Sequence, residues 1–274
     1  MVMVNSIQRY PEMQDQVAVV TGAASGIGAA VARDFAAQGC HVALLDADRP
    51  ALFRLVDALA DEVEGALRPI EVDVSDPDAV RSAVGDLTAG WGAISYLVNC
   101  TAGLVAAGAH AANEQWDRAL AVNVRSAAML LGECVPHMMP GSAAVHTASI
   151  AAREAQPLRW IHDAAKGAIF AMTRCQAFDL APRGIRVNLV SPGWMGAPEG
   201  VRPVPGDGDA GESAWGVHRI LPRAGQPCDV ARAVLFLCSE DASFISGTEM
   251  MVDGGYSVLS AASLRETSRV AGAV

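Results

Sequence analysis

The stretch Thr21-Gly22-Ala23-Ala24-Ser25-Gly26-Ile27-Gly28 decides the fold of this chain. An apolar run at 17–20 precedes it and indicates a buried strand, and an Ala- and Val-rich run at 29–38 follows it and indicates a helix. Glycines allow positive φ angles and close approach of the backbone to a ligand. The N-terminus of the helix then offers free N–H groups to a pyrophosphate. Strand, turn and helix together predict the first half of a βαβ unit that binds a dinucleotide, although the spacing Gly-x3-Gly-x-Gly differs from the commoner G-x-G-x-x-G.

The composition fits one large domain of 274 residues, in which hydrophobic residues make up 51%. No apolar run reaches the length that spans a membrane, and residues 1–16 lack the apolar core of a secretory signal. The net charge of −10 argues against nucleic acid as a partner. Six cysteines are scattered without metal or disulfide spacing, which is typical of reduced thiols in a cytoplasmic protein, so we expect no metal site.

The basic residues are 19 arginines and one lysine, Lys166. A composition bias replaces Lys by Arg wherever any cation serves, whereas an ammonium is a compact charge whose pKa can shift. The single remaining lysine therefore indicates a position that needs an ammonium.

Apolar strand and helix patterns alternate along the rest of the chain. We expect strands at 41–45, 67–74, 94–98, 143–148, 185–190 and 249–252, and helices at 48–63, 79–89, 116–138, 160–180 and 229–238. This alternation predicts an α/β fold in which helices cover both faces of a parallel sheet. Ligands bind at the carboxyl ends of such strands. The residues expected there are Gly22, Asp46, Asp73, Asn99, Ser149 and Pro192.

The carboxylate of Asp46 follows the glycine turn by about 20 residues, the spacing at which an acid binds the ribose hydroxyls of NAD. It would repel the 2′-phosphate of NADP, and neither Ser25 nor Ala47 offers a cation to that phosphate. The sequence therefore predicts NAD as the cofactor.

These patterns divide the chain into three segments: an N-terminal extension at 1–15, a dinucleotide-binding domain at 16–256 and a tail at 257–274. Within the domain, 194–218 is rich in Gly and Pro without periodicity, as in a substrate loop. The acids of this loop disfavour an anionic substrate by repulsion. They are Glu199, Asp207, Asp209 and Glu212. The small apolar segment 104–112 suits a neutral, fairly hydrophobic alcohol or ketone.

Over residues 16–255 the chain resembles the short-chain dehydrogenase/reductase (SDR) family. The matches, in the order of the family, are Thr21 to Gly28, Asp46, Asp73-Val74, Asn99, Asn123, Ser149, Lys166, Pro192-Gly193 and Asp253-Gly254-Gly255. The resemblance implies a single Rossmann-like, doubly wound domain with a seven-stranded parallel sheet. It also implies hydride transfer between a nicotinamide and a carbinol or carbonyl carbon, and a homotetramer paired through the helices that carry Asn123 and Lys166.

By the same resemblance, the residues that hold the cofactor are Gly22, Ser25, Gly26, Ile27, Gly28, Asp46, Asp73, Val74, Asn99, Thr101, Lys166, Pro192, Gly193 and Met195. The catalytic group is Asn123, Ser149, His162 and Lys166.

Position 162, four residues before Lys166, holds His where the family has Tyr. The spacing from Ser149 is the usual one of the family, and none of the three tyrosines of the chain is placed to substitute. Two lesser departures accompany it. The loop 99–103 is altered or shifted by one residue, and Ala197 stands where the family usually has a Thr that bonds the carboxamide.

The chemistry implied by the resemblance needs an acid/base at the substrate oxygen while hydride moves at carbon. His162 shares a helix face with Lys166 and is expected to fill that role. Ser149 is expected to stabilise the oxyanion. Lys166 is expected to hold the nicotinamide ribose and, through its charge, to lower the pKa of the imidazole.

The sequence leaves two functions open. In the first, the protein interconverts a secondary alcohol and a ketone with NAD(H), and His162 replaces Tyr; the intact Asn123, Ser149 and Lys166 favour it. In the second, the protein binds NAD(H) but performs a non-redox step such as cyclisation or dehydration, or acts as a nucleotide-binding regulator. Ala197 and the altered loop favour the second.

Overall fold

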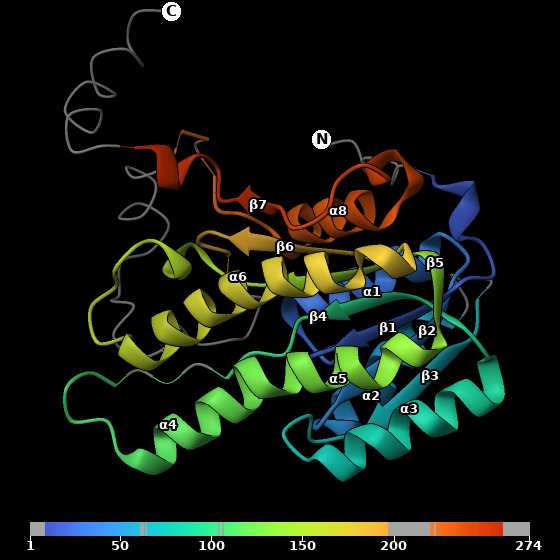
Figure 1. Cartoon of the computed structure of the whole chain (residues 1–274), viewed down its shortest axis with the longest axis horizontal. Coiled ribbons are helices and arrows are strands. Elements are labelled where there is room, and N and C mark those ends of the chain that lie inside the picture. The colour runs from blue at the N-terminus through green and yellow to red at the C-terminus, as the bar shows by residue number, and fades with distance from the viewer. Residues whose placement is uncertain are drawn as a thin grey trace, which may run out of the picture.

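A seven-stranded sheet in the order β3-β2-β1-β4-β5-β6-β7 forms the centre of the computed structural model (Figure 1). The structure describes residues 9–60, 63, 65–103, 105, 107–196, 220–221 and 223–259. The strands are β1 (Val17–Thr21), β2 (His41–Asp46), β3 (Leu67–Glu71), β4 (Ile94–Asn99), β5 (Met138–Thr147), β6 (Arg186–Pro192) and β7 (Glu249–Val252). All neighbouring strands pair in parallel. The strand order reverses between β1 and β4, where doubly wound folds bind their ligands.

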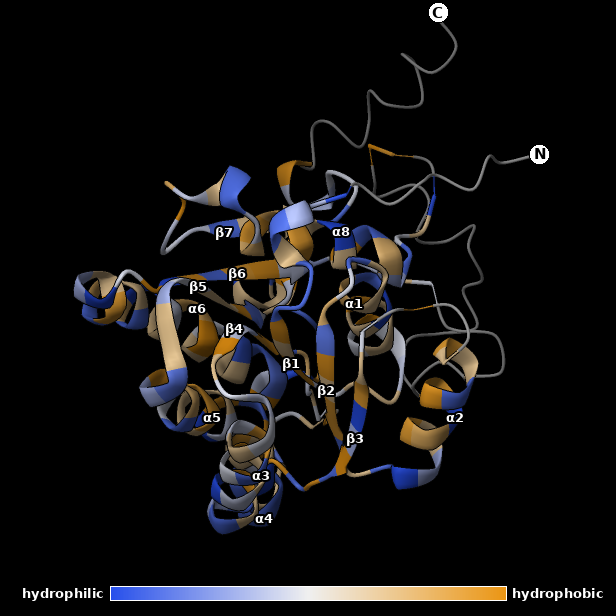
Figure 2. Ribbon diagram, turned by 90° about the vertical axis from the view of Figure 1, so that its right-hand side faces the viewer, coloured by the Kyte–Doolittle hydropathy of each residue, from blue (hydrophilic) through white to orange (hydrophobic). Residues whose placement is uncertain are grey.

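Helices cover both faces of the sheet, so the predicted fold class is confirmed. They are α1 (Gly26–Ala37), α2 (Arg49–Leu59), α3 (Pro77–Trp91), α4 (Asn113–Leu120), α5 (Ser126–Cys134), α6 (Trp160–Leu180) and α8 (Pro227–Cys238). Figure 2 shows α1 and α2 on one side of the sheet and α3, α5 and α6 on the other. α1 packs closely against α8, and α3 against α5. In the described part of the chain, no helix has the length and hydropathy needed to cross a bilayer.

Alternation along the strands builds two apolar layers. In β4, Tyr96 and Val98 pack toward the layer that contains α1 and α8, whereas Leu97 packs toward the layer that contains α3 and α5. Met13, in the predicted N-terminal extension, is fully buried in the first of these layers. The core therefore holds the strands, and with them their carboxyl ends, in fixed register.

The single helix expected over 116–138 is wrong. α4 ends at Leu120, a π-helical segment η2 (Ala121–Arg125) follows, and α5 ends before a short helix η3 (Val135–His137). Within η2, Asn123 Nδ2 donates to the carbonyl of Ala119, 2.8 Å away, and so competes with the regular backbone ladder. Met138 then begins β5 and pairs with Ile94.

Several predicted segments extend past the described residues. The substrate loop 194–218 is described only at 194–196, so Ala197 and the four acids of the loop lie outside the described residues. The tail 257–274 is described only to residue 259, and the extension 1–15 only from residue 9. α2 ends at Leu59, four residues earlier than expected.

Candidate active site

The predicted site residues at or just after the carboxyl ends of β1, β2, β4, β5 and β6 lie at one edge of the sheet, because all five strands run in parallel. They are Gly22, Asp46, Asn99, Ser149 and Gly193. Asp73 and Val74 follow β3 at the same edge.

The glycine turn between β1 and α1 fits the phosphates of a dinucleotide. Gly22 and Gly26 have φ angles of +63° and +54°. A Cβ on Gly22 would lie 2.9 Å from the amide nitrogen of Thr101, and one on Gly28 would lie 2.0 Å from the carbonyl oxygen of Gly22. A Cβ on Gly26 would meet nothing within 4 Å. The face of the turn at Gly22 and Gly28 thus packs tightly against the rest of the protein, whereas the turn stays open at Gly26, where α1 begins.

Two neighbours of the turn complete this end of α1. The side chain of Ser25, the N-cap residue, makes no cap hydrogen bond, which leaves the first N–H groups of the helix for another partner. Ile27 packs against the core and anchors the first turn of the helix.

Asp46 is fixed beside the turn by two backbone groups. Its Oδ2 accepts from Ala24 N at 3.1 Å, and its Oδ1 accepts from Asp48 N at 3.0 Å. The carboxylate therefore lies at the end of β2 with its charge next to the glycine turn.

Asp73 and Val74 form the corresponding corner after β3. Asp73 Oδ1 accepts from the backbone nitrogen and hydroxyl of Ser75 at 2.9 and 2.7 Å, and its Oδ2 pairs with Arg118 Nη1 at 3.0 Å. The Ser75 hydroxyl is the main cause that lowers the pKa of Asp73. Val74 is buried in the core. Arg118, from α4, was not predicted as a site residue, because a separation of 45 residues leaves no local pattern.

The loop after β4 is held at both ends. Thr21 Oγ1 accepts from Cys100 N at 3.1 Å and from Thr101 N at 3.2 Å. Asn123 Oδ1 accepts from Gly103 N at 3.1 Å, and Asn123 Nδ2 donates to Gly103 O at 3.0 Å. The loop that departs from the family pattern is therefore an ordered wall of the site.

Ser149 lies two residues after β5, and His162 and Lys166 lie on α6. Ser149 Oγ accepts from Ala151 N at 3.1 Å, so the hydroxyl proton stays available to a ligand. Lys166 is 3% exposed and donates from Nζ to Thr147 O at 2.9 Å. His162 is 9% exposed, and its Nδ1 is buried without a hydrogen-bond partner among the described residues.

Electrostatics keep the imidazole neutral. Burial is the largest cause that lowers the pKa of His162 to about 4, and the charges of Lys166 and Arg159 add to it. Burial also lowers the pKa of Lys166 to about 8, against a smaller opposing effect of Cys100. At neutral pH the site therefore holds a neutral imidazole one helical turn from an ammonium.

The end of β6 approaches β7 closely. A Cβ on Gly193 would lie 2.7 Å from Asp253 Cα, so glycine is required there. Beyond Pro192 and Gly193, Met195 forms an isolated bridge with Gly225 and lines a cavity of about 360 Å³.

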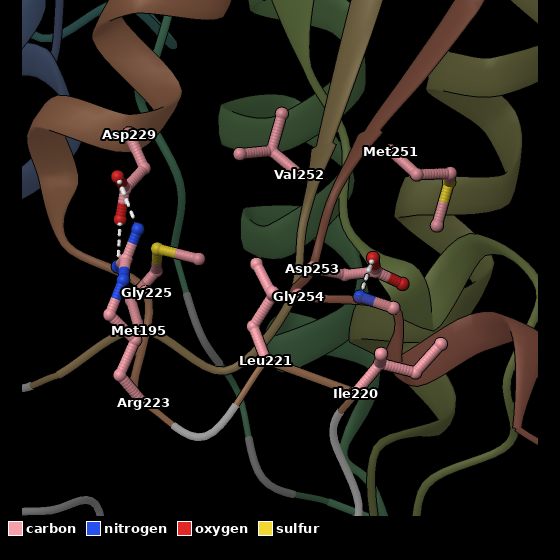
Figure 3. A pocket seen from close by; sticks show the side chains of 11 residues that line it. Met195, Ile220, Leu221, Arg223, Gly225, Asp229, Met251, Val252, Asp253 and Gly254 are labelled. Carbon is pink, nitrogen blue, oxygen red and sulfur yellow. Dashed lines mark hydrogen bonds and ion pairs between the residues drawn. The ribbon is translucent and has the colours of Figure 1, made fainter. Parts of the chain in front are cut away.

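Figure 3 shows the two charged walls of this cavity. Arg223 pairs with both carboxylate oxygens of Asp229, at 2.6 and 2.9 Å, on one side. On the other, Asp253 accepts from Gly255 N at 2.9 Å. Sequence reasoning missed the Arg223–Asp229 pair, which lies close to the predicted substrate loop.

No group of three or more His, Cys, Asp or Glu within the described ranges is arranged to hold a metal ion. All six cysteines are free thiols. The cytoplasmic location inferred from the cysteines stays a prediction.

Comparison with known proteins identifies the family. A family model described as enoyl-(acyl carrier protein) reductase matches residues 22–257. The chain is 36% identical to 2-(R)-hydroxypropyl-CoM dehydrogenase of Xanthobacter autotrophicus, over 89% of this chain and 99% of that one. It is 33% identical to cyclopentanol dehydrogenase of a Comamonas species, over 89% and 98%. The chain belongs to the short-chain dehydrogenase/reductase family.

The SDR fold extends to solved structures. L-sorbose reductase of Gluconobacter frateurii, solved with NADPH and L-sorbose, superposes with a TM-score of 0.83 at 28% identity, over 89% of this chain and 97% of that one. This chain is therefore an SDR-family oxidoreductase whose fold binds a nicotinamide dinucleotide. The glycine turn, open at Gly26 and flanked by the fixed carboxylate of Asp46, fits that cofactor.

Proposed function

We propose that this SDR protein interconverts secondary alcohols and ketones with NAD(H), and that His162 is its acid/base in place of Tyr. The observation that carries the proposal is a buried imidazole with an unpaired nitrogen, one turn from Lys166. A buried polar atom without a partner costs free energy unless a ligand satisfies it. A substrate hydroxyl would supply that partner.

The nicotinamide, when bound, accepts or supplies the hydride. In oxidation, His162 takes the proton of the hydroxyl as the C–O bond becomes a carbonyl. The hydroxyl of Ser149, whose oxygen is already engaged by Ala151 N, donates to the substrate oxygen. Lys166 would hold the nicotinamide ribose, and Asn123 would hold the loop after β4 in place.

A neutral imidazole favours oxidation. With a pKa of about 4, nearly all His162 is in the base form at neutral pH, whereas reduction would need the rare imidazolium. We therefore assign alcohol oxidation as the faster direction at neutral pH.

The substrate we propose is a neutral, fairly hydrophobic small molecule. The apolar character of segment 104–112 supports this class, as does the likeness to a cyclopentanol dehydrogenase. We propose NAD over NADP because the Asp46 carboxylate lies at the end of β2, where a 2′-phosphate would meet its charge.

A homotetramer is the assembly we propose. Phe178, on α6, is 82% exposed, and Leu120, at the end of α4, is 38% exposed. Exposed apolar side chains on these helices favour burial against another copy. Light scattering at micromolar concentration tests it, and the mass of a monomer would contradict it.

A second candidate is a non-redox proton abstraction, such as a dehydration. The neutral state of His162 at neutral pH favours it, because the imidazole can take a proton from carbon, and the imidazolium formed in that step can return the proton to the departing hydroxyl. In that case the protein would bind NAD(H) without turning it over.

The test follows NADH formation over a panel of neutral secondary alcohols, cyclopentanol included. Wild type is compared with His162→Ala, with Ser149→Ala, and with Cys175→Ala as a control at an exposed position of α6. We expect turnover by wild type and the control, and a loss of about 10²-fold or more in both site variants. Full activity of His162→Ala would exclude His162 as the base. NAD binding by wild type without turnover of any alcohol or ketone would favour the second candidate.

A further inference from the structure

His146 lies beneath the site and has no part in the chemistry proposed above. It is 1% exposed, on the face of β5 that α5 and α6 cover. Its Nδ1 lies 3.1 Å from Asn99 Nδ2, and its Nε2 lies 2.8 Å from Gln176 Oε1. A buried imidazole thus connects the end of β4 with the last turns of α6.

The partners of His146 determine which ring nitrogen carries the proton. An amide oxygen only accepts, so Nε2 must hold the proton and donate it to Gln176. Nδ1 is then an acceptor, and only the NH₂ group of Asn99 can donate to it. Burial lowers the pKa of His146 to about 4, so the imidazole stays neutral, as this arrangement requires.

The chain of bonds fixes the orientation of the Asn99 amide. Asn99 and His146 are register partners on neighbouring strands, so their side chains share one face of the sheet. With Nδ2 committed to His146, Asn99 Oδ1 must point away from that imidazole. Without Gln176, His146 could take the other tautomer, and the amide could turn over.

A small cavity connects this amide to the cofactor edge. Its volume of about 10 Å³ is about the least that admits one water molecule. Its polar lining is Thr21, Asn99, Thr101, Asn123, Ser126, His146 and Thr147. Thr21 and Thr101 belong to the turn and loop that face the dinucleotide, and the carbonyl of Thr147 holds Lys166.

We propose that His146, oriented by Gln176, is a positioning residue for the dinucleotide: it turns the Asn99 amide so that Oδ1 accepts a hydrogen bond from the cofactor, directly or through one water. The inference rests on the dinucleotide site of the SDR fold and is independent of the role of His162. Because Asn99 is in β4, between the Asp46 corner and Lys166, the effect belongs to the ribose–nicotinamide half of the cofactor rather than to its adenine half.

The test measures binding of NADH by fluorescence and of ADP by calorimetry at pH 7.5. ADP lacks the nicotinamide half and reports on the adenine end alone. The variants are Gln176→Leu, which removes the acceptor; Gln176→Glu, which keeps an acceptor for Nε2–H; and His146→Leu. Cys175→Ala, beside Gln176 and exposed, is the control.

We expect Gln176→Leu and His146→Leu to weaken NADH binding about fivefold to twentyfold, in line with the loss of one hydrogen bond. ADP binding should stay within twofold, and Gln176→Glu should bind both ligands as wild type does. The double variant with Gln176→Leu and His146→Leu should bind NADH no more weakly than the worse single variant, because both substitutions interrupt the same chain of hydrogen bonds.

Unchanged NADH binding in Gln176→Leu would overturn the proposal, as would a Gln176→Glu variant as weak as Gln176→Leu. Equal weakening of ADP would show a general structural defect and also overturn it. If His146→Leu does not fold, the two Gln176 variants decide alone. Failure of wild type to oxidise alcohols leaves this test intact, because it reads binding and not turnover.

Discussion

Lys166 lies one turn after His162 on α6, and its ammonium is the second cause, after burial, of the low pKa of that imidazole. An ammonium stabilises the anion that a tyrosine forms on losing its proton, whereas it destabilises the cation that a histidine forms on gaining one. The same lysine would therefore make a tyrosine a better proton donor, whereas it holds a histidine in the neutral form.

Removing that charge should raise the pKa of His162. In Lys166→Met we expect the pKa to move up from about 4 but to stay below its ordinary value of about 6.5, because burial remains. NMR of the imidazole-labelled protein, assigned with His162→Ala, measures it. An unchanged or lower pKa of His162 in Lys166→Met would contradict the effect of the Lys166 charge on this imidazole.

Asp46 should set the choice of cofactor. Asp46→Ala removes the charge beside the glycine turn, so the preference for NADH over NADPH should fall by about tenfold or more. Dissociation constants for both cofactors, in both proteins, measure it. Tighter binding of NADPH by wild type, or a preference that the substitution leaves unchanged, would contradict the assignment.

Asp34 should make stability depend on pH. It is 5% exposed in α1, its Oδ2 has no partner among the described residues, and burial raises its pKa to about 6. A raised pKa means that the folded state binds the proton more tightly. The stabilisation is therefore full below about pH 4 and is lost as pH rises through 6.

Asp34→Asn removes this ionisation and should stabilise the protein by about 2 kcal/mol at pH 7.5, with less effect at pH 5. Urea denaturation at both pH values measures it, with Asp57→Asn, at an exposed position of α2, as control. Destabilisation at pH 7.5 equal to that at pH 5 would show that a packing change, and not the charge, governs this position.

Arg153 and Glu249 should hold the turn after Ser149. Arg153 Nε donates to Glu249 Oε2 at 2.5 Å, and Ser191 Oγ donates to the other carboxylate oxygen at 2.6 Å. The side chain of Glu249 is 6% exposed, whereas that of Arg153 is 52% exposed. Breaking the pair leaves a buried charge unpaired.

Arg153→Met should therefore cost about 2 kcal/mol, below the range for a fully buried pair, because solvent screens the arginine. The double variant with Glu249→Gln should recover part of the loss. Urea denaturation of wild type, both single variants and the double variant forms the cycle. Independent, additive effects would show that the pair does not couple.

The alternation of strands and helices was enough to predict the fold, because parallel strands and amphipathic helices leave local, periodic patterns. α6 and β7 have the predicted bounds. The break at Asn123 could not be located, since it depends on hydrogen bonds to Gly103, which only the folded chain brings near. The sequence predicts one continuous helix over 116–138, and no local pattern in it indicates the π-helical geometry around Asn123.

The residues of the candidate site likewise divide into those that local patterns predict and those that depend on contacts in the folded chain. The glycine turn, Asp46, Ser149, His162 and Lys166 follow from motif and spacing. Arg118 on Asp73 and the Gln176–His146–Asn99 chain depend on contacts between distant segments, so no local pattern predicts them. The low pKa of His162 was predicted in direction from Lys166 alone, whereas its main cause is burial, which requires the structure.

The pH dependence of kcat/KM for alcohol oxidation by wild type and His162→Tyr tests the central claim most directly. A base with a pKa of about 4 predicts that wild-type activity is constant from about pH 5 to 7 and falls only near pH 4. A tyrosine must lose a proton to act as the base, and its ordinary pKa is about 10, so the acid limb of His162→Tyr should lie at least two pH units higher. Acid limbs at the same pH in both proteins would contradict the assignment of His162 as the base.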